Sequence, residues 1–353
     1  MRDACEALEK IKRGMYVFLR EGSAAHNLVD LLPVLERADN RRLCLCTDDR
    51  HADDLIEQGS INYLLEIGVA HGYEPEDLIP MATLNIAECY GLQQTGALAP
   101  GYQADIVAFE DLRSFQPVHV VKGGALTVKN RRLLWKSDPV LKMPGQSMNM
   151  PEVTKEDFKI PARPNMRMRV IGISQTQLLT TKLHLDPTIR NGEIVSDTER
   201  DVLKMAVCER HHNTGNIGLG FVYGFGLKKG AIATTVGHDS HNLSVVGTND
   251  EDMVVAVNRL REIGGGLIVV SEGQVRATVP LAIAGLMSDR DAVAVNAQIR
   301  QLEFWVKELG IPEEFSTFMI LAFLSLPVIP ELRLTDRGLV DVVRFEHVDL
   351  WCD

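Results

Sequence analysis

Hydrophobic positions in the first 95 residues alternate between helical spacing and short strand-like runs. Helical spacing covers residues 3–13, 28–38, 54–70 and 74–90, and apolar strand-like runs cover 15–19 and 42–46. Strands that alternate with helices predict a parallel sheet or a (β/α) barrel. Two strands are too few to close a barrel. We therefore expect either a small sheet or the last part of a barrel.

The pattern changes after residue 95. A turn-rich stretch leads into apolar runs at 106–109, 118–121 and 125–128, which predict a compact β module over 96–136. Residues 137–165 contain five prolines and little periodicity. We expect this stretch to be a linker or an extended crossing segment.

The remaining block, 166–353, mixes both kinds of spacing. Strands are predicted at 231–236, 243–246, 267–270 and 275–279, and a long helix at 291–309. Thr248 and Glu251 fit a capping box that opens another helix. Ser196 and Glu199 fit one as well, which predicts a helix through Glu209. The block therefore reads as an α+β domain with its own core.

Composition and charge exclude several functional classes. The 353 residues are 45% hydrophobic and carry a net charge of −11, whereas a nucleic-acid backbone binder needs a basic stripe. No apolar run approaches the roughly 20 residues of a membrane-spanning helix. The six cysteines lack metal or disulfide spacing, so we expect reduced thiols and a cytoplasmic protein.

The strongest local signal for chemistry is Asp48 and Asp49, which follow an apolar strand. Barrel enzymes place catalytic groups at this end of their strands. One Asp there can ligate a divalent metal and take a proton from the metal-bound water, while its neighbour meets substrate. The alternative is that one of the two carboxylates caps the next helix. The spacing alone leaves both interpretations open.

A second signal is the group His238, Asp239 and His241, which lies between two predicted strands. Polar residues at a strand exit suit a structural turn, a substrate or lid contact, or a metal pair. His211 and His212 follow the helix predicted through Glu209, where they would serve the helix dipole. Neither phosphate-binding glycine motif follows a strand, no G-x-S-x-G elbow occurs, and the sequence contains no H-x-H.

Several longer strings carry a family likeness. They are residues 81–87, 96–107, 45–51, 20–25, 236–242, 247–250, 263–266, 283–288 and 326–332. The first two resemble the close of an amidohydrolase-superfamily barrel and its entry into a small β-sandwich. Residues 45–51 resemble the last barrel strand, and the others extend the likeness to bacterial adenine deaminases over nearly the whole chain.

This resemblance implies a fold of three structured parts and a linker. Residues 1–95 would be the C-terminal remnant of a metal-dependent (β/α)8 barrel, 96–136 a small β-sandwich module, 137–165 a linker and 166–353 a C-terminal α+β domain. It further implies hydrolysis of adenine to hypoxanthine and ammonia in purine salvage, at a binuclear centre of manganese or iron. Asp48 would correspond to the metal-ligating Asp that also handles the water proton.

The resemblance also implies an incomplete ligand set, because the family's H-x-H and its later His ligands have no counterpart in this sequence. Asp49, Glu21, His238, Asp239 and His241 are expected as substrate-binding or lid residues. Expected partners are adenine and either further copies of the chain or a complementary N-terminal chain, with no nucleic acid and no membrane. The alternative function is a non-catalytic remnant or purine-binding module.

Overall fold

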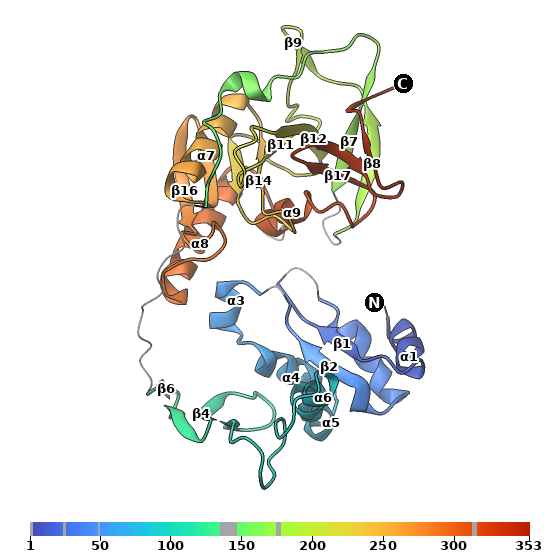
Figure 1. Ribbon diagram of the computed structural model, residues 1–353, viewed down its shortest axis with the longest axis vertical. Coiled ribbons are helices and arrows are strands. Elements are labelled where there is room, and N and C mark those ends of the chain that lie inside the picture. Colours follow the sequence, from blue (N-terminus) through green and yellow to red (C-terminus); the bar gives the residue numbers. More distant parts are fainter. Residues whose placement is uncertain (1–2, 24–25, 49, 135–146, 174–177, 313–315) are drawn as a thin grey trace. The chain divides into compact units, whose positions relative to one another are not determined.

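The computed structural model describes residues 3–23, 26–48, 50–134, 147–173, 178–312 and 316–353. The chain forms two compact units, Met1–Leu141 and Lys142–Asp353 (Figure 1). Each unit buries hydrophobic clusters of its own. None of the helices in the described ranges is long and apolar enough to cross a membrane.

The first unit contains two parallel strands packed among helices. β1 (Val17–Arg20) pairs in parallel with β2 (Leu43–Cys46), as the βα alternation predicts. The buried side chains of Leu19 and Leu45 join the core of this unit. The helices are α1 (Ala4–Lys12), α2 (Leu28–Leu31), α3 (Ala52–Glu57), α4 (Ile61–Ala70), α5 (Pro75–Ala82) and α6 (Leu84–Cys89), with 3₁₀ turns at Leu32–Glu36 and Asn40–Arg42. A closed barrel needs more strands than these two and stays a prediction.

The helices of this unit are shorter than the hydrophobic periodicity predicts. The expected helix over 54–70 is broken near Gly59, whose φ of +104° lies in the region that favours glycine. The expected helix from Glu74 is divided at Thr83, where the backbone leaves helical geometry at φ −137° and ψ −91°. The hydrophobic spacing continues across both breaks, because the short helices on either side pack against the same core.

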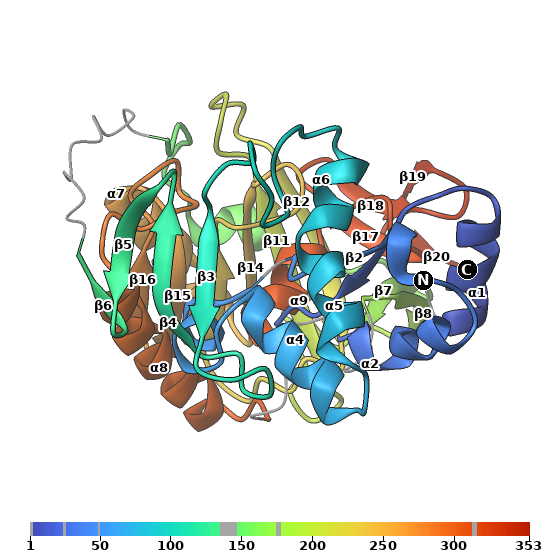
Figure 2. The same cartoon turned by 90° about the horizontal axis from the view of Figure 1, so that it is seen from below.

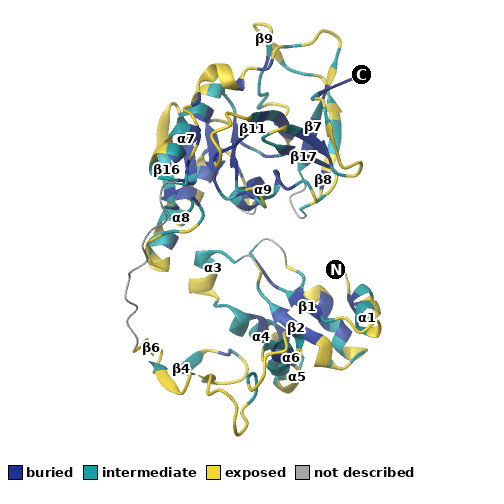
Figure 3. Cartoon of the chain, viewed as in Figure 1, coloured by how far each residue is buried: buried dark blue, intermediate teal, exposed yellow. Residues whose placement is uncertain are grey.

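The compact β module forms an antiparallel meander of β3 (Ile106–Phe109), β4 (Pro117–Lys122), β5 (Ala125–Lys129) and β6 (Arg132–Leu133). Figure 2 shows β3, β4 and β5 as neighbouring strands. Most of its side chains are exposed or half-buried (Figure 3). A sandwich needs a second sheet packed on the first, and the described residues of the module form one sheet. The sandwich therefore stays a prediction.

The second unit is organised by a nine-stranded sheet that is almost entirely antiparallel. Its strand order is β16-β15-β13-β14-β11-β12-β7-β20, and β8 pairs with β7. The strands are β7 (Arg167–Ile173), β8 (Thr180–Leu185), β11 (Val202–Cys208), β12 (Ile217–Tyr223), β13 (Ala231–Thr234), β14 (Leu243–Gly247), β15 (Gly266–Ser271), β16 (Gln274–Pro280) and β20 (Trp351–Cys352). Two short strands, β9 (Ile189–Arg190) and β10 (Glu193–Ile194), form a separate hairpin.

Helices and a second sheet cover the two faces of the large sheet. α7 (Asp250–Ile263) packs on one face, and α8 (Ala292–Glu308) and α9 (Thr317–Phe323) contribute to the cluster on the other. The cluster on the α8 and α9 face also includes side chains of β17 (Leu332–Thr335) and β18 (Gly338–Asp341). These two strands form a small antiparallel sheet with β19 (Glu346–Val348). Asn249 caps α7 by accepting a hydrogen bond from the Asp252 N–H, one residue after the predicted capping Thr248.

The helix predicted through Glu209 is wrong. Residues 202–208 form the central strand β11, and every residue in it is buried. Met205 faces one hydrophobic cluster and Ala206 the other, so both faces of the strand require apolar side chains. A buried run that is apolar except for Lys204 looks alike in a strand and in a helix, so periodicity alone cannot separate the two.

Part of the expected linker belongs to the core of the second unit. Met148, Val153 and Phe158 are buried against α7, and a 3₁₀ turn covers Lys155–Phe158. Asn258 of α7 accepts a hydrogen bond from the Val153 N–H and donates one to the Val153 carbonyl. The prolines still prevent regular structure here, but an extended segment can bury side chains at irregular spacing. Residues 137–146 of the expected linker lie outside the described residues.

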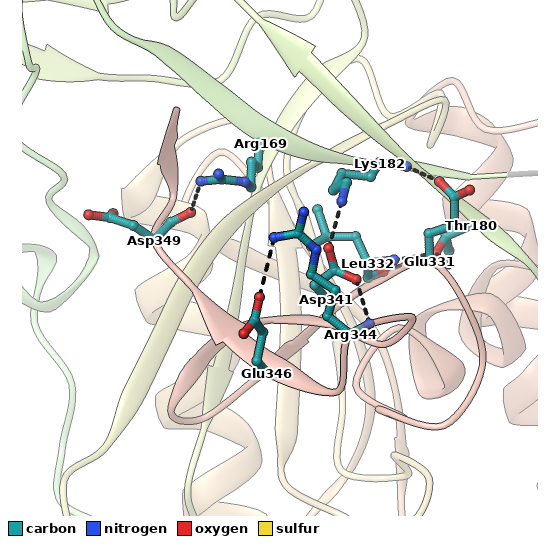
Figure 4. Close-up of polar contacts among 9 residues, drawn as sticks. All are labelled: Arg169, Thr180, Lys182, Glu331, Leu332, Asp341, Arg344, Glu346 and Asp349. Carbon is teal, nitrogen blue, oxygen red and sulfur yellow. Dashed lines mark hydrogen bonds and ion pairs between the residues drawn. The ribbon is translucent and has the colours of Figure 1, made fainter. Parts of the chain in front are cut away.

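Polar contacts fasten the β17–β18 hairpin to β8 (Figure 4). Lys182 Nζ donates to Asp341 Oδ2 at 2.6 Å, and the Lys182 N–H donates to Glu331 Oε2 at 2.9 Å. The Thr180 hydroxyl donates to the Leu332 carbonyl at 2.9 Å. Because Asp341 is only 2% exposed, this ion pair is a fixed part of the packing.

Candidate functional site

The carboxyl ends of β1 and β2 bring two of the predicted site residues to one edge of the sheet. Arg20 lies opposite Cys46 in the parallel register, and the Glu21 N–H donates to the Cys46 carbonyl at 3.0 Å. Glu21 and Asp48 therefore both follow strands at the edge where parallel α/β enzymes place their chemistry. The sequence predicts that Asp48 follows a buried strand, and β2 ends at Cys46, two residues before it.

Asp48 has a constrained conformation. Its φ is +56°, a left-handed value that Asp tolerates better than most residues. Its Oδ2 accepts a hydrogen bond from Arg20 Nη1 at 2.5 Å. Burial raises the pKa of the nearby Cys46 thiol. The Asp48 charge raises this pKa further, and the Arg20 charge lowers it. The carboxylate and the guanidinium thus form a charged pair across the ends of the two strands.

The helix-cap alternative fails for Asp48. The next helix, α3, begins at Ala52, and its N-cap residue is His51. An N-cap side chain bonds to the N–H groups two or three residues further on, so Asp48 lies too early to cap this helix. Asp49 lies outside the described residues.

Glu21 makes local contacts of its own. The residue is 8% exposed; one carboxylate oxygen lies 2.6 Å from His26 Nδ1, and the other accepts from the Leu28 N–H at 3.3 Å. These contacts anchor the first turn of α2 to the end of β1. Glu21 thereby shapes the strand-end loop, and its expected contact with substrate stays a prediction.

Ser23 joins the loops that follow β1 and β2, a role that the sequence did not reveal. Its hydroxyl donates to Asp54 Oδ2 at 2.5 Å and accepts from the His51 N–H at 2.7 Å. A hydroxyl that both donates and accepts can fix two loops at once. Residues 20–25 carry part of the family likeness, but no spacing rule indicates that Ser23 meets residues 51 and 54.

The described residues do not form a complete metal site. Across the described ranges, nowhere do three or more His, Cys, Asp or Glu side chains come together in a way that could hold a metal ion. Catalytic metal centres use about three protein ligands. Asp48 is paired with Arg20, and Glu21 is engaged with His26 and the α2 backbone. These residues alone do not fit the binuclear centre that the resemblance implies.

The turn predicted between two strands in the second unit lies between β13 and β14. The His238 ring stacks on Phe323 of α9 with ring centroids 4.4 Å apart, and the His238 N–H donates to the Ala322 carbonyl at 2.9 Å. Asp239 is 86% exposed in its side chain and lies 3.9 Å from His238 Nδ1. The turn is thus held on its inner side by α9 and presents a carboxylate outward.

His241 faces a cavity of about 520 Å³ in the second unit. The same cavity is lined by Arg210, His211, Ser240 and Asn149, among others. Burial lowers the pKa of His241, and the neighbouring charges of His238, Arg210 and His211 lower it further, against the opposing charge of Asp239. The turn at 238–241 therefore lines this cavity through Ser240 and His241.

Arg210 and His211 were not recognised as site residues from the sequence. The sequence pattern predicts a helix through Glu209 with His211 at its end, whereas His211 follows the strand β11, which pairs with β14. Its Nε2 lies 2.8 Å from the Ser240 carbonyl. A strand assignment for 202–208 would have placed both residues at a strand exit and marked them for attention.

The sequence matches two family models and several known proteins. The adenine deaminase C-terminal domain family matches residues 177–346, and the amidohydrolase family matches residues 9–127. Adenine deaminase 2 of Carboxydothermus hydrogenoformans is 50% identical over 97% of this chain and 60% of its own length. Adenine deaminases of Lysinibacillus sphaericus and Bacillus pumilus are 44% and 45% identical, over 98% of this chain and 60% and 61% of their lengths.

Similarity to solved structures is limited. A β-aspartyl dipeptidase from Fervidobacterium islandicum-AW-1 matches 37% of this chain and 36% of its own at 21% identity, with a TM-score of 0.32. The sequence relationship is far stronger. It extends over almost all of this chain, while the chain spans about 60% of the length of the relatives it matches. On these grounds residues 177–346 belong to the adenine deaminase C-terminal domain family and residues 9–127 to the amidohydrolase family.

Proposed function

We propose that this chain supplies the C-terminal part of an adenine deaminase, which hydrolyses adenine to hypoxanthine and ammonia in cytoplasmic purine salvage. The observation that carries the proposal is the 50% identity to a named adenine deaminase over 97% of the chain. The relatives have about two fifths of their length outside the matched region. We propose that a barrel segment of that kind completes the site, within one polypeptide, as a complementary chain or in a homo-oligomer.

The reaction replaces the amino group on C6 of adenine by oxygen from water. Water adds to C6; of its two protons, one ends on N1 of the ring and the other on the amino group, which departs as ammonia. We assign Asp48 as the proton acceptor, since it lies at a strand end with its carboxylate oriented by Arg20. Manganese or iron is the metal expected from the resemblance. Because the described residues do not complete a metal centre, no step here is assigned to the metal.

The remaining predicted residues would handle substrate and solvent. Glu21 follows β1, and Asp49 is next to Asp48 in the sequence; both would contact the purine. His238, Asp239 and His241 would act as a lid or as substrate contacts. Excluding water strengthens electrostatic interactions at a reacting centre, which gives such a lid its purpose.

The test is to complete the chain. The part of the Carboxydothermus adenine deaminase that this chain does not match is joined to residues 1–353, and the folded, manganese-supplemented hybrid is assayed for ammonia release from adenine. We expect turnover that a chelator abolishes, and none from the 353-residue chain alone. A folded, metal-loaded hybrid that leaves adenine intact would contradict the proposal. Chelator-sensitive deamination by the chain alone would contradict the need for completion.

The alternative function is a purine-binding module without catalysis. It is favoured by one observation: the described residues gather no set of three metal ligands. Calorimetric titration of the 353-residue chain with adenine separates the two hypotheses. Adenine binding by the isolated chain, together with an inactive hybrid, would favour the binding module. An active hybrid would exclude it.

A further inference from the structure

The cavity beside His241 combines an arginine with two histidines. Its described lining includes Arg210, His211 and His241 but no Asp or Glu. Its volume of about 520 Å³ exceeds what a simple ion needs, and Met148 and Leu286 give it an apolar part. In a chain with a net charge of −11, a carboxylate-free cavity around a cationic side chain favours an anionic ligand.

Arg210 is the central group of this cavity. The residue is fully buried, and its guanidinium donates to three main-chain carbonyls from separate segments: Ser147 at 3.1 Å, His241, and Ala284 at 3.0 Å. Its hydrogen bonds in the structure go to neutral acceptors. Carbonyl dipoles orient a guanidinium without neutralising it. Burial lowers the pKa of Arg210, and the charge of the neighbouring Glu209 partly opposes that effect. A ligand oxyanion would gain from the guanidinium charge.

The neighbouring acid, Glu209, faces its own turn. Its carboxylate accepts hydrogen bonds from the N–H groups of His211, His212 and Thr214 and from the Thr214 hydroxyl. Burial acts to raise the pKa of Glu209, but these bonds outweigh it and lower the pKa to about 2. Glu209 thereby fixes the backbone that positions His211 on the cavity wall.

A close backbone approach also shapes the cavity. Gly285 has a φ of +70°, and a Cβ at this position would lie 2.9 Å from Arg210 Nη1. The Gly285 carbonyl accepts a hydrogen bond from the buried Thr235 hydroxyl at 2.6 Å. The loop that contains Ala284 is therefore held against the guanidinium from both sides, which makes the wall a preorganised one.

Arg333 shows what a buried arginine does without such a cavity. It is 1% exposed and donates to the carbonyls of Ile329, Phe323 and Leu178, as Arg210 does to its own three. The space beside Arg333 is only about 10 Å³ and is lined chiefly by apolar residues. Arg333 is therefore explained by packing alone, whereas Arg210 has the same anchoring and an open polar cavity in addition.

We propose that the cavity lined by Arg210, His211 and His241 binds a small oxyanion, either inorganic phosphate or the phosphate of a phosphorylated small molecule. Arg210 provides the charge, the histidine rings provide N–H donors, and Asn149 lies on the same wall. Met148 and Leu286 would contact the organic part of a larger ligand. The cavity lies within the second unit, so the inference does not depend on the proposed deaminase activity.

The test is calorimetric titration of the 353-residue chain with inorganic phosphate, adenosine 5′-monophosphate, adenosine and adenine. We expect binding of the two phosphates, weakened about tenfold or more by His211→Ala and by Arg210→Lys. His184→Ala and Arg333→Lys are the matched controls and should bind as the parent does. His211 is exposed at the cavity, so His211→Ala keeps the test valid if Arg210→Lys fails to fold.

The arms distinguish the source of the oxyanion. Tighter binding of the nucleotide than of inorganic phosphate would identify a phosphorylated small molecule, and equal binding would identify free phosphate; both outcomes support the site. Binding of neither phosphate would overturn the proposal. So would adenosine or adenine binding as tightly as the nucleotide, or parent-like phosphate binding by folded His211→Ala.

Discussion

Arg20 and Asp48 join the ends of two parallel strands through a hydrogen bond of 2.5 Å between Nη1 and Oδ2. Arg20 is the last residue of β1, and Asp48 lies two residues beyond β2. The contact orients the Asp48 carboxylate at the edge of the sheet where the chemistry of α/β enzymes is found. The two residues have different roles: Arg20 orients the carboxylate, and Asp48 is proposed to accept the proton.

Replacing the proposed proton acceptor should affect turnover in the completed hybrid enzyme. We expect Asp48→Asn to lower kcat by at least about 10²-fold, the low end for loss of acid–base catalysis. The control is Asp111→Asn, which removes a carboxylate from an exposed turn of the β module. Steady-state assays of ammonia release measure both variants. Near-normal kcat for Asp48→Asn would mean that this carboxylate only holds Arg20.

The turn of the second unit should affect catalysis without affecting metal content. In the hybrid enzyme, His238→Ala and His241→Ala should lower kcat/KM while the bound metal, measured by elemental analysis, stays at the parent level. The reason is that a lid excludes water and contacts substrate but ligates nothing. Loss of metal from either variant would instead identify a ligand. Unchanged kcat/KM in both would remove the turn from the site.

The Lys182–Asp341 pair should make stability depend on pH. The hydrogen bond from Lys182 lowers the pKa of Asp341 below its ordinary value of 3.8, against the opposing effect of burial. A folded-state pKa below the unfolded one adds stability that is present above the unfolded pKa and is lost as the pH falls through the folded one. The loss should therefore begin near pH 4 and continue below it.

Urea unfolding of Asp341→Asn and the parent, followed from pH 7 to pH 2, checks this contribution. We expect the variant to be less stable at pH 7 by about 2 kcal/mol, below the about 3–5 kcal/mol for breaking a fully buried pair, because Lys182 is partly exposed. The difference should shrink in acid. Asp105→Asn, in a surface pair with Lys122, is the control and should change stability little. A pH-independent difference for Asp341→Asn would contradict the linkage.

Two glycines of β12 should respond differently to the same substitution. A Cβ at Gly218 would overlap the Thr335 carbonyl oxygen, whereas a Cβ at Gly220 would lie 3.4 Å from side-chain atoms of Leu334 and Leu339. A backbone atom cannot rotate away, but a leucine can adjust. We expect Gly218→Ala to cost about 3 kcal/mol and Gly220→Ala under about 1 kcal/mol. Equal losses in thermal or urea unfolding would contradict the packing argument.

Local sequence patterns determined much of the second unit. Alternating or continuous apolar runs correctly indicated β13, β14, β15 and β16, because each run is short and bounded by turn residues. The helix α8 was indicated by a long amphipathic pattern with Asp291 at its N-cap. These features depend on residues that are close in the sequence, and a local hydrophobic pattern records those residues.

Tertiary structure decided the features that depend on residues far apart. β11 is a strand because both of its faces meet hydrophobic clusters, a fact that its seven residues do not encode. Ser23 meets His51 and Asp54 because β1 and β2 lie in parallel register.

For the candidate sites, the sequence by itself determined the family, the strand-end position of Asp48 and the polar turn at 238–241. Only the tertiary structure brought Arg210 and His211 to His241 around one cavity, and only it paired Arg20 with Asp48. The physical reason is that spacing rules describe one helix or strand at a time. Burial, close backbone approach and charge pairing arise between segments, and they exist once the chain has folded.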